Sequence, residues 1–155
     1  MIRKAKEKDI KKIMDLLVQV DMVHHNGRPD IFNGPATKYT KEQLLAIFAD
    51  PQTPVFVSVD EQERVQGYAF CQLQQIVGDT IRTDIRTLYI DDLCVDETVR
   101  GQHIGTKLYE HVCRFAKEQG CYNVTLNVWT CNPSAMQFYT ARGMSAQKIG
   151  MEQIL

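Results

Sequence analysis

The residues from Val99 to His111, VRGQHIGTKLYEH, have the composition of a turn that binds an anion. They follow a strand-like stretch ending at Val95, so a helix starting near Ile104 would direct its unpaired N–H groups at one place. Gly101 and Gly105 permit close approach of the backbone, and Arg100 adds a positive charge. An ordinary strand-to-helix turn is the alternative. The spacing matches neither a Walker loop nor the dinucleotide fingerprint.

A second segment with chemical potential is WTCNPSAMQFYTARGM, from Trp129 to Met144. Asn132 is a good cap for a helix whose first residue is Pro133. Phe138 and Tyr139 share one side of that helix. The phenol of Tyr139 is therefore either a proton donor or a core aromatic group.

Other elements must position these two segments. A short strand-like start leads into a helix with apolar residues at helical spacing from Ile10 to Val20. Residues 21–39 are predicted as a long loop, followed by a helix capped by Thr40 and Gln43. Strands are then predicted over 54–60, 65–77 and 85–96, a helix from the anion turn to Gly120, a strand over 121–129, a helix over 132–142 and a final strand over 144–155. This order predicts a single α+β domain, residues 1–155.

Composition excludes several classes. The net charge of −1 gives no field that would attract nucleic acid, and no apolar run is long enough to span a membrane. The N-terminus lacks the apolar core of a signal peptide. Five cysteines without metal-ligand spacing predict reduced thiols, a cytoplasmic protein and no metal site.

Taken together, the two segments resemble the GNAT superfamily of acyl-CoA-dependent N-acetyltransferases. The resemblance rests on the strand DDLCV, the motif RGQHIGT at a helix start, and NPSAMQFYTARG one strand later. The segment is also similar to the diamine and polyamine acetyltransferase branch, which has an acidic residue at the same position of the strand before the turn. The resemblance implies a mixed, mostly antiparallel, twisted sheet flanked by about four helices, with two strands splayed around acetyl-CoA.

The resemblance also implies which residues hold the cofactor. The backbones of Leu93 and Val95, with Cys94 between them, would bind the pantetheine arm and the acetyl carbonyl. Asn132 would contact the far arm, and Tyr139 would lie near the sulfur. The pyrophosphate would be surrounded by Arg100, Gly101, Gln102, His103, Ile104, Gly105 and Thr106. His103 stands where a glycine is expected, and histidine tolerates a positive φ better than most residues.

An alkylamine has a pKa of about 10.4 and is protonated at neutral pH, so acetyl transfer to it needs a proton acceptor. Alternation along a strand would send the side chains of Asp91 and Asp92 to opposite faces. Asp91, on the face of Leu93 and Val95, is the favoured base, and Asp92 is the second candidate. Tyr139 would protonate the departing thiolate. A covalent route through Cys94 is disfavoured, because no histidine is placed by the sequence to activate it.

The acceptor site is the least determined part. In this superfamily the loop between the first two helices helps to form it, which makes His24 and His25 candidates alongside Asp91 and Trp129. A loop shaped by Asn26, Gly27 and Pro29 is an equal alternative for the histidines, and buried packing is favoured for Trp129. The expected protein is an N-acetyltransferase of a small amine or a protein amine, forming a homodimer; a non-catalytic CoA-binding module is the alternative.

Overall fold

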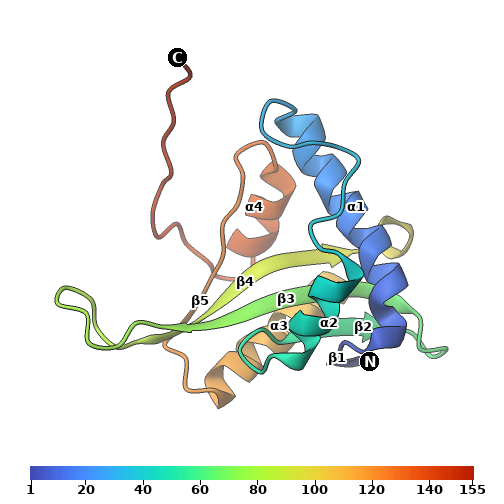
Figure 1. Cartoon of the computed structure of the whole chain (residues 1–155), viewed down its shortest axis with the longest axis horizontal. Coiled ribbons are helices and arrows are strands. Elements are labelled where there is room, and N and C mark those ends of the chain that lie inside the picture. Colours follow the sequence, from blue (N-terminus) through green and yellow to red (C-terminus); the bar gives the residue numbers. More distant parts are fainter.

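The computed structural model describes residues 1–155 and contains both strands and helices (Figure 1). The strands are β1 (Ile2–Lys4), β2 (Val55–Val59), β3 (Val65–Gln75), β4 (Arg86–Val95) and β5 (Asn123–Thr125). The helices are α1 (Ile10–Gly27), α2 (Lys41–Ala49), α3 (Ile104–Glu118) and α4 (Pro133–Thr140), with short 3₁₀ turns at Glu7–Asp9 and Glu97–Val99. The predicted α+β class is confirmed.

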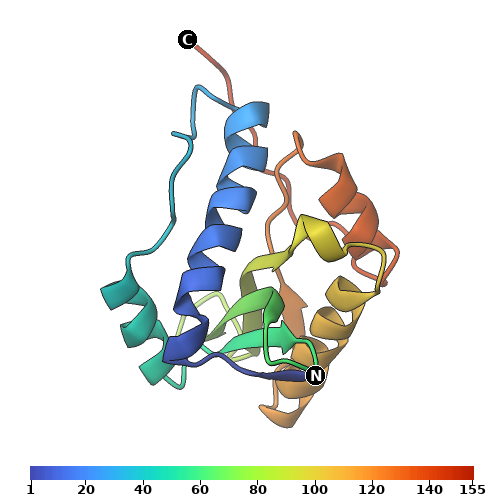
Figure 2. The same ribbon diagram turned by 90° about the vertical axis from the view of Figure 1, so that its right-hand side faces the viewer.

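The strands form one sheet in the order β1-β2-β3-β4-β5. Every neighbouring pair is antiparallel except β4 and β5, which run parallel and are connected through α3. Helices α1 and α2 lie on one face of the sheet, and α3 and α4 lie on the other (Figure 2). Each face has its own apolar core, one centred on Ile13, Leu17 and Tyr68 and the other on Leu88, Leu108 and Val112.

Several local predictions are confirmed because they depend on neighbouring residues alone. Thr40 and Gln43 form a reciprocal capping box at the start of α2, with the Thr40 N–H donating to Gln43 at 2.8 Å. Gly120 follows α3 with a φ of 72°, the left-handed conformation that ends many helices.

A β-bulge in β4 overturns the prediction that Asp91 and Asp92 lie on opposite faces. Register with β3 passes from the pair Phe70 and Asp92 to the pair Cys71 and Ile90, which leaves Asp91 without a partner. The extra residue reverses the alternation of side chains. Ile90 therefore packs on the α3 face and Cys94 on the α1 face, although an even spacing should place them together. Asp91 consequently does not share a face with Leu93 and Val95.

Strands β4 and β5 separate soon after they meet. They pair only from Thr87 to Tyr89, opposite Asn123 to Thr125. The strand expected over 121–129 is therefore short, because its second half leaves the sheet. The outer edge of β4 from Ile90 to Val95 has no strand beside it, so the predicted splay is confirmed.

Two predicted boundaries are wrong. Helix α1 continues to Gly27, so the loop begins at residue 28 and not at 21. Residues 144–155 form no strand: Met144 packs on the core beside α3, and the residues after it form an exposed extended tail whose Glu152 pairs with Arg28 (Figure 1). A strand needs a hydrogen-bonding neighbour, and this segment pairs with no strand of the sheet. No helix is long and apolar enough to cross a membrane.

Candidate active site

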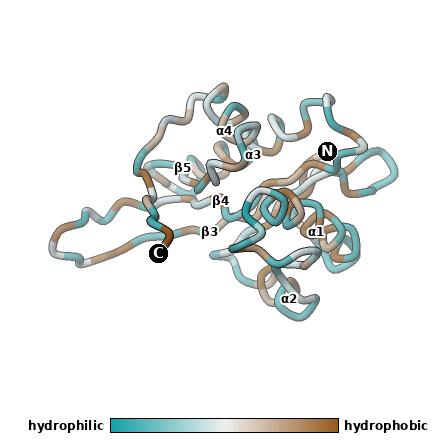
Figure 3. Tube along the Cα trace, turned by 90° about the horizontal axis from the view of Figure 1, so that it is seen from above, coloured by the Kyte–Doolittle hydropathy of each residue, from teal (hydrophilic) through white to brown (hydrophobic).

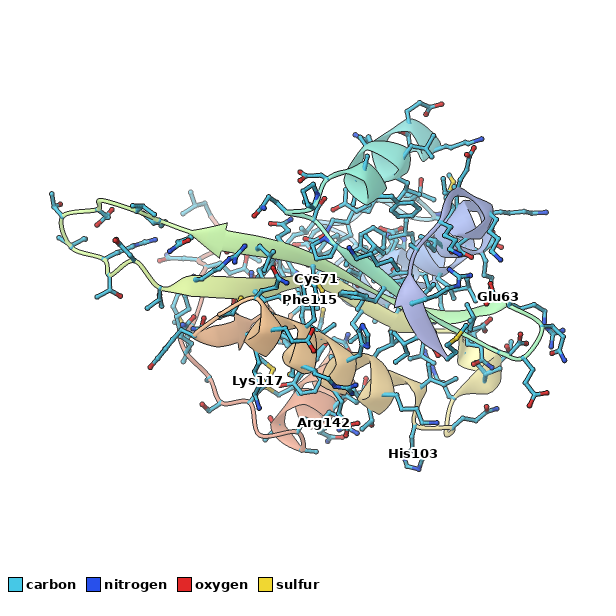
Figure 4. The ribbon with its side chains drawn as sticks, turned by 90° about the horizontal axis from the view of Figure 1, so that it is seen from below. Glu63, Cys71, His103, Phe115, Lys117 and Arg142 are labelled. Atoms are coloured by element: carbon cyan, nitrogen blue, oxygen red, sulfur yellow. The ribbon has the colours of Figure 1, made fainter.

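The turn between β4 and α3 presents a group of free N–H donors. No N–H from Gly101 to Thr106 donates a hydrogen bond within the chain, and α3 begins at Ile104 without a side-chain cap. His103 has a φ of 57° and Gly101 a φ of 83°, so both adopt the left-handed conformation. The His103 side chain is exposed and projects from the body of the protein (Figure 4). This backbone geometry suits an anion at the start of α3.

Helix α1 braces this turn from behind. The Lys12 ammonium lies 2.5 Å from the carboxylate of Asp96, and this partner holds the pKa of Asp96 down at about 2. Gln19 donates to the carbonyl of Val95 at 2.9 Å and accepts from the N–H of Glu97 at 3.2 Å. These contacts fix the end of β4 relative to the turn.

The unpaired edge of β4 runs directly into the turn. The N–H of Asp96 donates to Gln66 of β3 at 2.9 Å. Since successive backbone groups of an antiparallel strand point to opposite sides, those of Leu93 and Val95 point to the edge that has no neighbouring strand, where the Val95 carbonyl already accepts from Gln19. The residues predicted to hold a pantetheine arm are therefore positioned to accept an extended ligand.

Helix α4 closes the turn from the other side. Asn132 caps it as predicted, accepting from the N–H of Ala135 at 3.3 Å. Arg142 stacks on the ring of Phe138, with 3.8 Å from guanidinium carbon to ring centroid, and donates to the hydroxyl of Thr106. Both Thr106 and Arg142 thus lie at the first turn of α3.

The sequence did not suggest Arg142 as a residue of this turn. A cation near a helix N-terminus is unfavourable unless an anion binds there. What places Arg142 at the turn is its hydrogen bond with Thr106. The two residues are 36 positions apart along the chain, so no local sequence pattern reveals that contact.

The bulge brings two carboxylates to the α1 face beside two tyrosines. Asp91 accepts from the Tyr39 hydroxyl at 2.7 Å and from the Lys38 ammonium at 2.8 Å. Asp92 accepts from the Tyr68 hydroxyl at 2.7 Å. Both tyrosine rings pack on Phe70. The sequence suggested neither tyrosine nor Lys38, because the long loop and β3 supply them.

Burial raises the pKa of Asp92 to about 6, against an ordinary 3.8. The carboxylate therefore stays ionised at neutral pH and is basic enough to accept a proton. Burial also raises the pKa of Tyr139 above its ordinary value, and the next cause is the negative charge of Asp92. Tyr139 therefore stays protonated near Asp92.

Cys94 lies beside this group but is turned away from the splay. Its thiol packs in the α1 core and accepts from Gln19 at 3.4 Å. Burial raises the pKa of Cys94 to about 12, so the thiolate is scarce at neutral pH. The geometry agrees with the prediction against a covalent route through Cys94.

The predicted acceptor residues fall into two groups. His25 is a loop anchor, with its Nδ1 2.7 Å from the carbonyl oxygen of Phe32. His24 stacks on the Phe32 ring at 5.0 Å, and Trp129 packs edge-on against the same ring at 5.0 Å. His24 and Trp129 therefore lie close together, on either side of the Phe32 ring that both contact. Trp129 is 40% exposed, so the favoured expectation that it is buried is wrong.

Comparisons with known proteins show the family and the fold. The model of the acetyltransferase (GNAT) family matches residues 19–144. Bovine thialysine N-epsilon-acetyltransferase is 29% identical over 154 residues, covering 92% of this chain and 82% of its own. The peptidyl-lysine N-acetyltransferase YjaB of Salmonella typhimurium is 27% identical, covering 92% of this chain and 81% of its own. The crystal structure of a mutant of the BH1408 protein from Bacillus halodurans has a TM-score of 0.96 at 33% identity, covering 100% of this chain and 99% of that one.

Proposed function

This chain belongs to the GNAT family of acetyltransferases, and on that premise we propose that it transfers the acetyl group of acetyl-CoA to a primary alkylamine. The acceptor is a small amine or an amine of a protein, as in relatives named for thialysine and peptidyl-lysine. The observation that carries the proposal is the carboxylate of Asp92, whose pKa burial raises to about 6, on the strand whose outer edge is unpaired. The enzyme is proposed as a single domain working in the cytoplasm, consistent with its five free cysteines.

The residues present fit acetyl-CoA. Free N–H groups from Gly101 to Thr106 suit a pyrophosphate, and Arg142 adds charge at the same place. The free edge of β4 at Leu93 and Val95 suits the amide groups of a pantetheine arm. In the proposal Arg100, Gln102 and Asn132 complete this binding surface.

The mechanism follows from the chain's own groups. Acetyl-CoA supplies a thioester whose carbonyl carbon bonds to the amine nitrogen as its carbon–sulfur bond breaks. Asp92 takes a proton from the amine, directly or through one water, and its neighbour Asp91 holds positive charge on the acceptor. Tyr139 gives its proton to the departing sulfur. The sequence favoured Asp91 as the base and Asp92 as the second candidate. We reverse that order because the Asp91 carboxylate is already bonded to Lys38 and Tyr39.

A thiol-release assay tests this function against the alternative of a CoA-binding module. The panel consists of polyamines, amino acids, aminoglycosides and lysine peptides, each with acetyl-CoA. We expect acceptor-dependent release of CoA with at least one amine class. Tight acetyl-CoA binding without release for any of them would favour the binding module.

His103→Gly tests whether the turn acts through its backbone. Glycine keeps the N–H and adopts the left-handed conformation without a Cβ. We expect affinity for acetyl-CoA, measured by calorimetry, to stay within a few fold. A hundredfold loss, about 2.7 kcal/mol, would show that the imidazole itself binds the cofactor.

The homodimer is proposed from the apolar residues on the projecting segments. The arm between β3 and β4 and the tail hold a set of exposed side chains: Ile76, Val77, Ile81, Ile85, Ile149, Met151, Ile154 and Leu155. Figure 3 shows hydrophobic colour along both segments. The tail also carries unpaired backbone groups, and the outer edge of β5 has no neighbour. In the proposed dimer the tail of one copy lies against the other copy.

Removal of residues 146–155 tests the dimer. Since the tail is exposed and its ion pair with the body, Glu152 with Arg28, lies at the surface, the shortened chain should fold with nearly unchanged melting temperature. Sedimentation analysis should find the full chain as a dimer and the shortened chain as a monomer. A monomeric full chain at micromolar concentration would contradict the proposal.

A further inference from the structure

A cavity of about 440 Å³ lies on the flank of α3 that faces β1 and β2. Ser58 of β2 lines it from the sheet, and the side chain of Gln102 lines it from the turn before α3. Helix α3 supplies four polar side chains whose spacing of three and four residues places them on one side of a helix: Lys107, Glu110, His111 and Arg114. The volume is in the range of pockets that hold small molecules.

The polar side chains of this cavity have no partner within the chain. Glu110 is three residues after Lys107 and four before Arg114, spacings at which opposite charges pair on a helix surface. Neither ion pair forms, so all three charged groups are free to bind a ligand. Ser58 is the buried member of the set: it is only 5% exposed, and its hydroxyl makes no hydrogen bond.

The order of charges along this flank indicates the chemistry of the ligand. Lys107 and Arg114 are two helical turns apart, about 10 Å along the axis, so they are placed to bind two separate anionic groups. Glu110 lies between them, where it repels a third negative charge and accepts hydrogen bonds from hydroxyl groups.

The rest of the lining also suits hydroxyl groups. The hydroxyl of Ser58 and the amide of Gln66 are uncharged groups that both donate and accept hydrogen bonds, and they line the cavity from the sheet. Three of the ten lining residues are apolar, so the cavity favours a polar ligand. The arrangement matches a molecule with an anion at each end and hydroxyl groups in the middle.

We propose that this cavity binds a small sugar bisphosphate, at a site separate from the one proposed for acetyl-CoA. One phosphate pairs with Lys107 and the other with Arg114. The hydroxyl groups of the sugar bond to Glu110, Ser58 and Gln66.

The two sites lie on different flanks of α3. On the flank that faces α4, Thr106 accepts from Arg142, and the Tyr109 ring lies 6.1 Å from that of Tyr139. On the flank that faces the sheet edge, the His111 ring packs against Phe56 of β2 at 4.6 Å. Both ligands can therefore bind at the same time.

Calorimetry with fructose 1,6-bisphosphate tests the proposal, with glucose 6-phosphate and inorganic phosphate compared at equal ionic strength. The bisphosphate should bind about tenfold or more tightly than the monophosphate, because it makes a second charge-assisted contact. Inorganic phosphate should bind more weakly than either sugar. Saturation with acetyl-CoA should change the affinity for the bisphosphate less than threefold.

Variants of the two cations test which residues hold the phosphates. Lys107→Met and Arg114→Met should each weaken the binding of fructose 1,6-bisphosphate by about tenfold or more, and both residues are exposed, so the fold should persist. Ser58→Ala removes one neutral hydrogen bond and should weaken binding by about two- to tenfold. Lys117→Met is the matched control, because Lys117 is an exposed lysine of the same helix that does not line the cavity. It should leave the affinity unchanged.

Three results would overturn the inference: equal affinity for the bisphosphate and the monophosphate, loss of binding in the presence of acetyl-CoA, or unchanged affinity in both Lys107→Met and Arg114→Met. The measurement records binding alone. It therefore gives the same answer whether or not the chain transfers acetyl groups, and a failure of the proposed function would be seen separately in the thiol-release assay.

Discussion

Asp92→Asn should lower kcat/KM for an amine acceptor by a factor of about 10²–10⁴ at pH 7. The amide keeps the shape of the side chain and still accepts the Tyr68 hydroxyl, which lies 2.7 Å from the carboxylate, but it cannot take a proton. Wild-type activity should fall as the pH drops through about 6, because the carboxylate is then protonated. In the variant that step should be absent, and activity should recover partly at high pH as free amine becomes abundant.

The same substitution should stabilise the protein at neutral pH. Since the pKa of Asp92 is about 6 when folded and 3.8 ordinarily, the folded state holds this proton more tightly than the unfolded state. Ionisation therefore costs stability, increasingly between about pH 4 and pH 6 and fully above that. Urea unfolding at pH 7 should give Asp92→Asn roughly 1–3 kcal/mol more stability, and the difference should vanish near pH 4.

Asp91→Asn is the control that distinguishes the two carboxylates. If Asp91 holds the acceptor, the variant should raise KM and keep the loss of activity below pH 6. If Asp91→Asn removes that pH dependence while Asp92→Asn keeps it, the base is Asp91, as first suggested from the sequence.

Gly105→Val should weaken acetyl-CoA binding by a hundredfold or more. A Cβ at this position would lie 3.3 Å from two ring carbons of Phe138 and 3.4 Å from the side chain of Val95. Valine adds two further carbons, which must push α4 and the end of β4 away from the first turn of α3. The free N–H groups then no longer converge, and overpacking costs about 1–3 kcal/mol of stability. Calorimetry with acetyl-CoA and thermal unfolding measure the two effects.

A double substitution tests the steric cause. Phe138→Ala removes the ring that valine would strike, so Gly105→Val with Phe138→Ala should bind acetyl-CoA at least tenfold better than Gly105→Val alone. Gly105→Ala, which demands a shift of only a few tenths of an ångström, should have a small effect. If the double substitution gives no recovery, the glycine matters for a reason other than space beside Phe138.

Local features of the fold and of the site could be predicted from the sequence. The Thr40 and Gln43 box, the Asn132 cap and the turn at Gly101 each depend on residues within a few positions of one another. The turn is predicted to bind an anion because glycines and a helix start need no distant partner to produce free N–H groups. The two motifs and their order along the chain then identified the family.

Only the tertiary structure decided on which face of the sheet the side chains of Asp91 and Asp92 lie and which residues surround them. Alternation along an isolated strand predicts opposite faces, but the bulge exists only in register with β3, so no local rule reveals it. Lys38 and Tyr39 reach Asp91 from a loop more than fifty residues earlier, and Arg142 reaches Thr106 in a similar way. The tail, too, has the pattern of a strand but pairs with no strand of the sheet. The sequence by itself thus determined the turn, the caps and the family, because short-range hydrogen bonds, backbone conformation and the order of the motifs dictate them. The tertiary structure decided which groups surround the two aspartates of the proposed acceptor site, because strand register and loop packing bring those groups together.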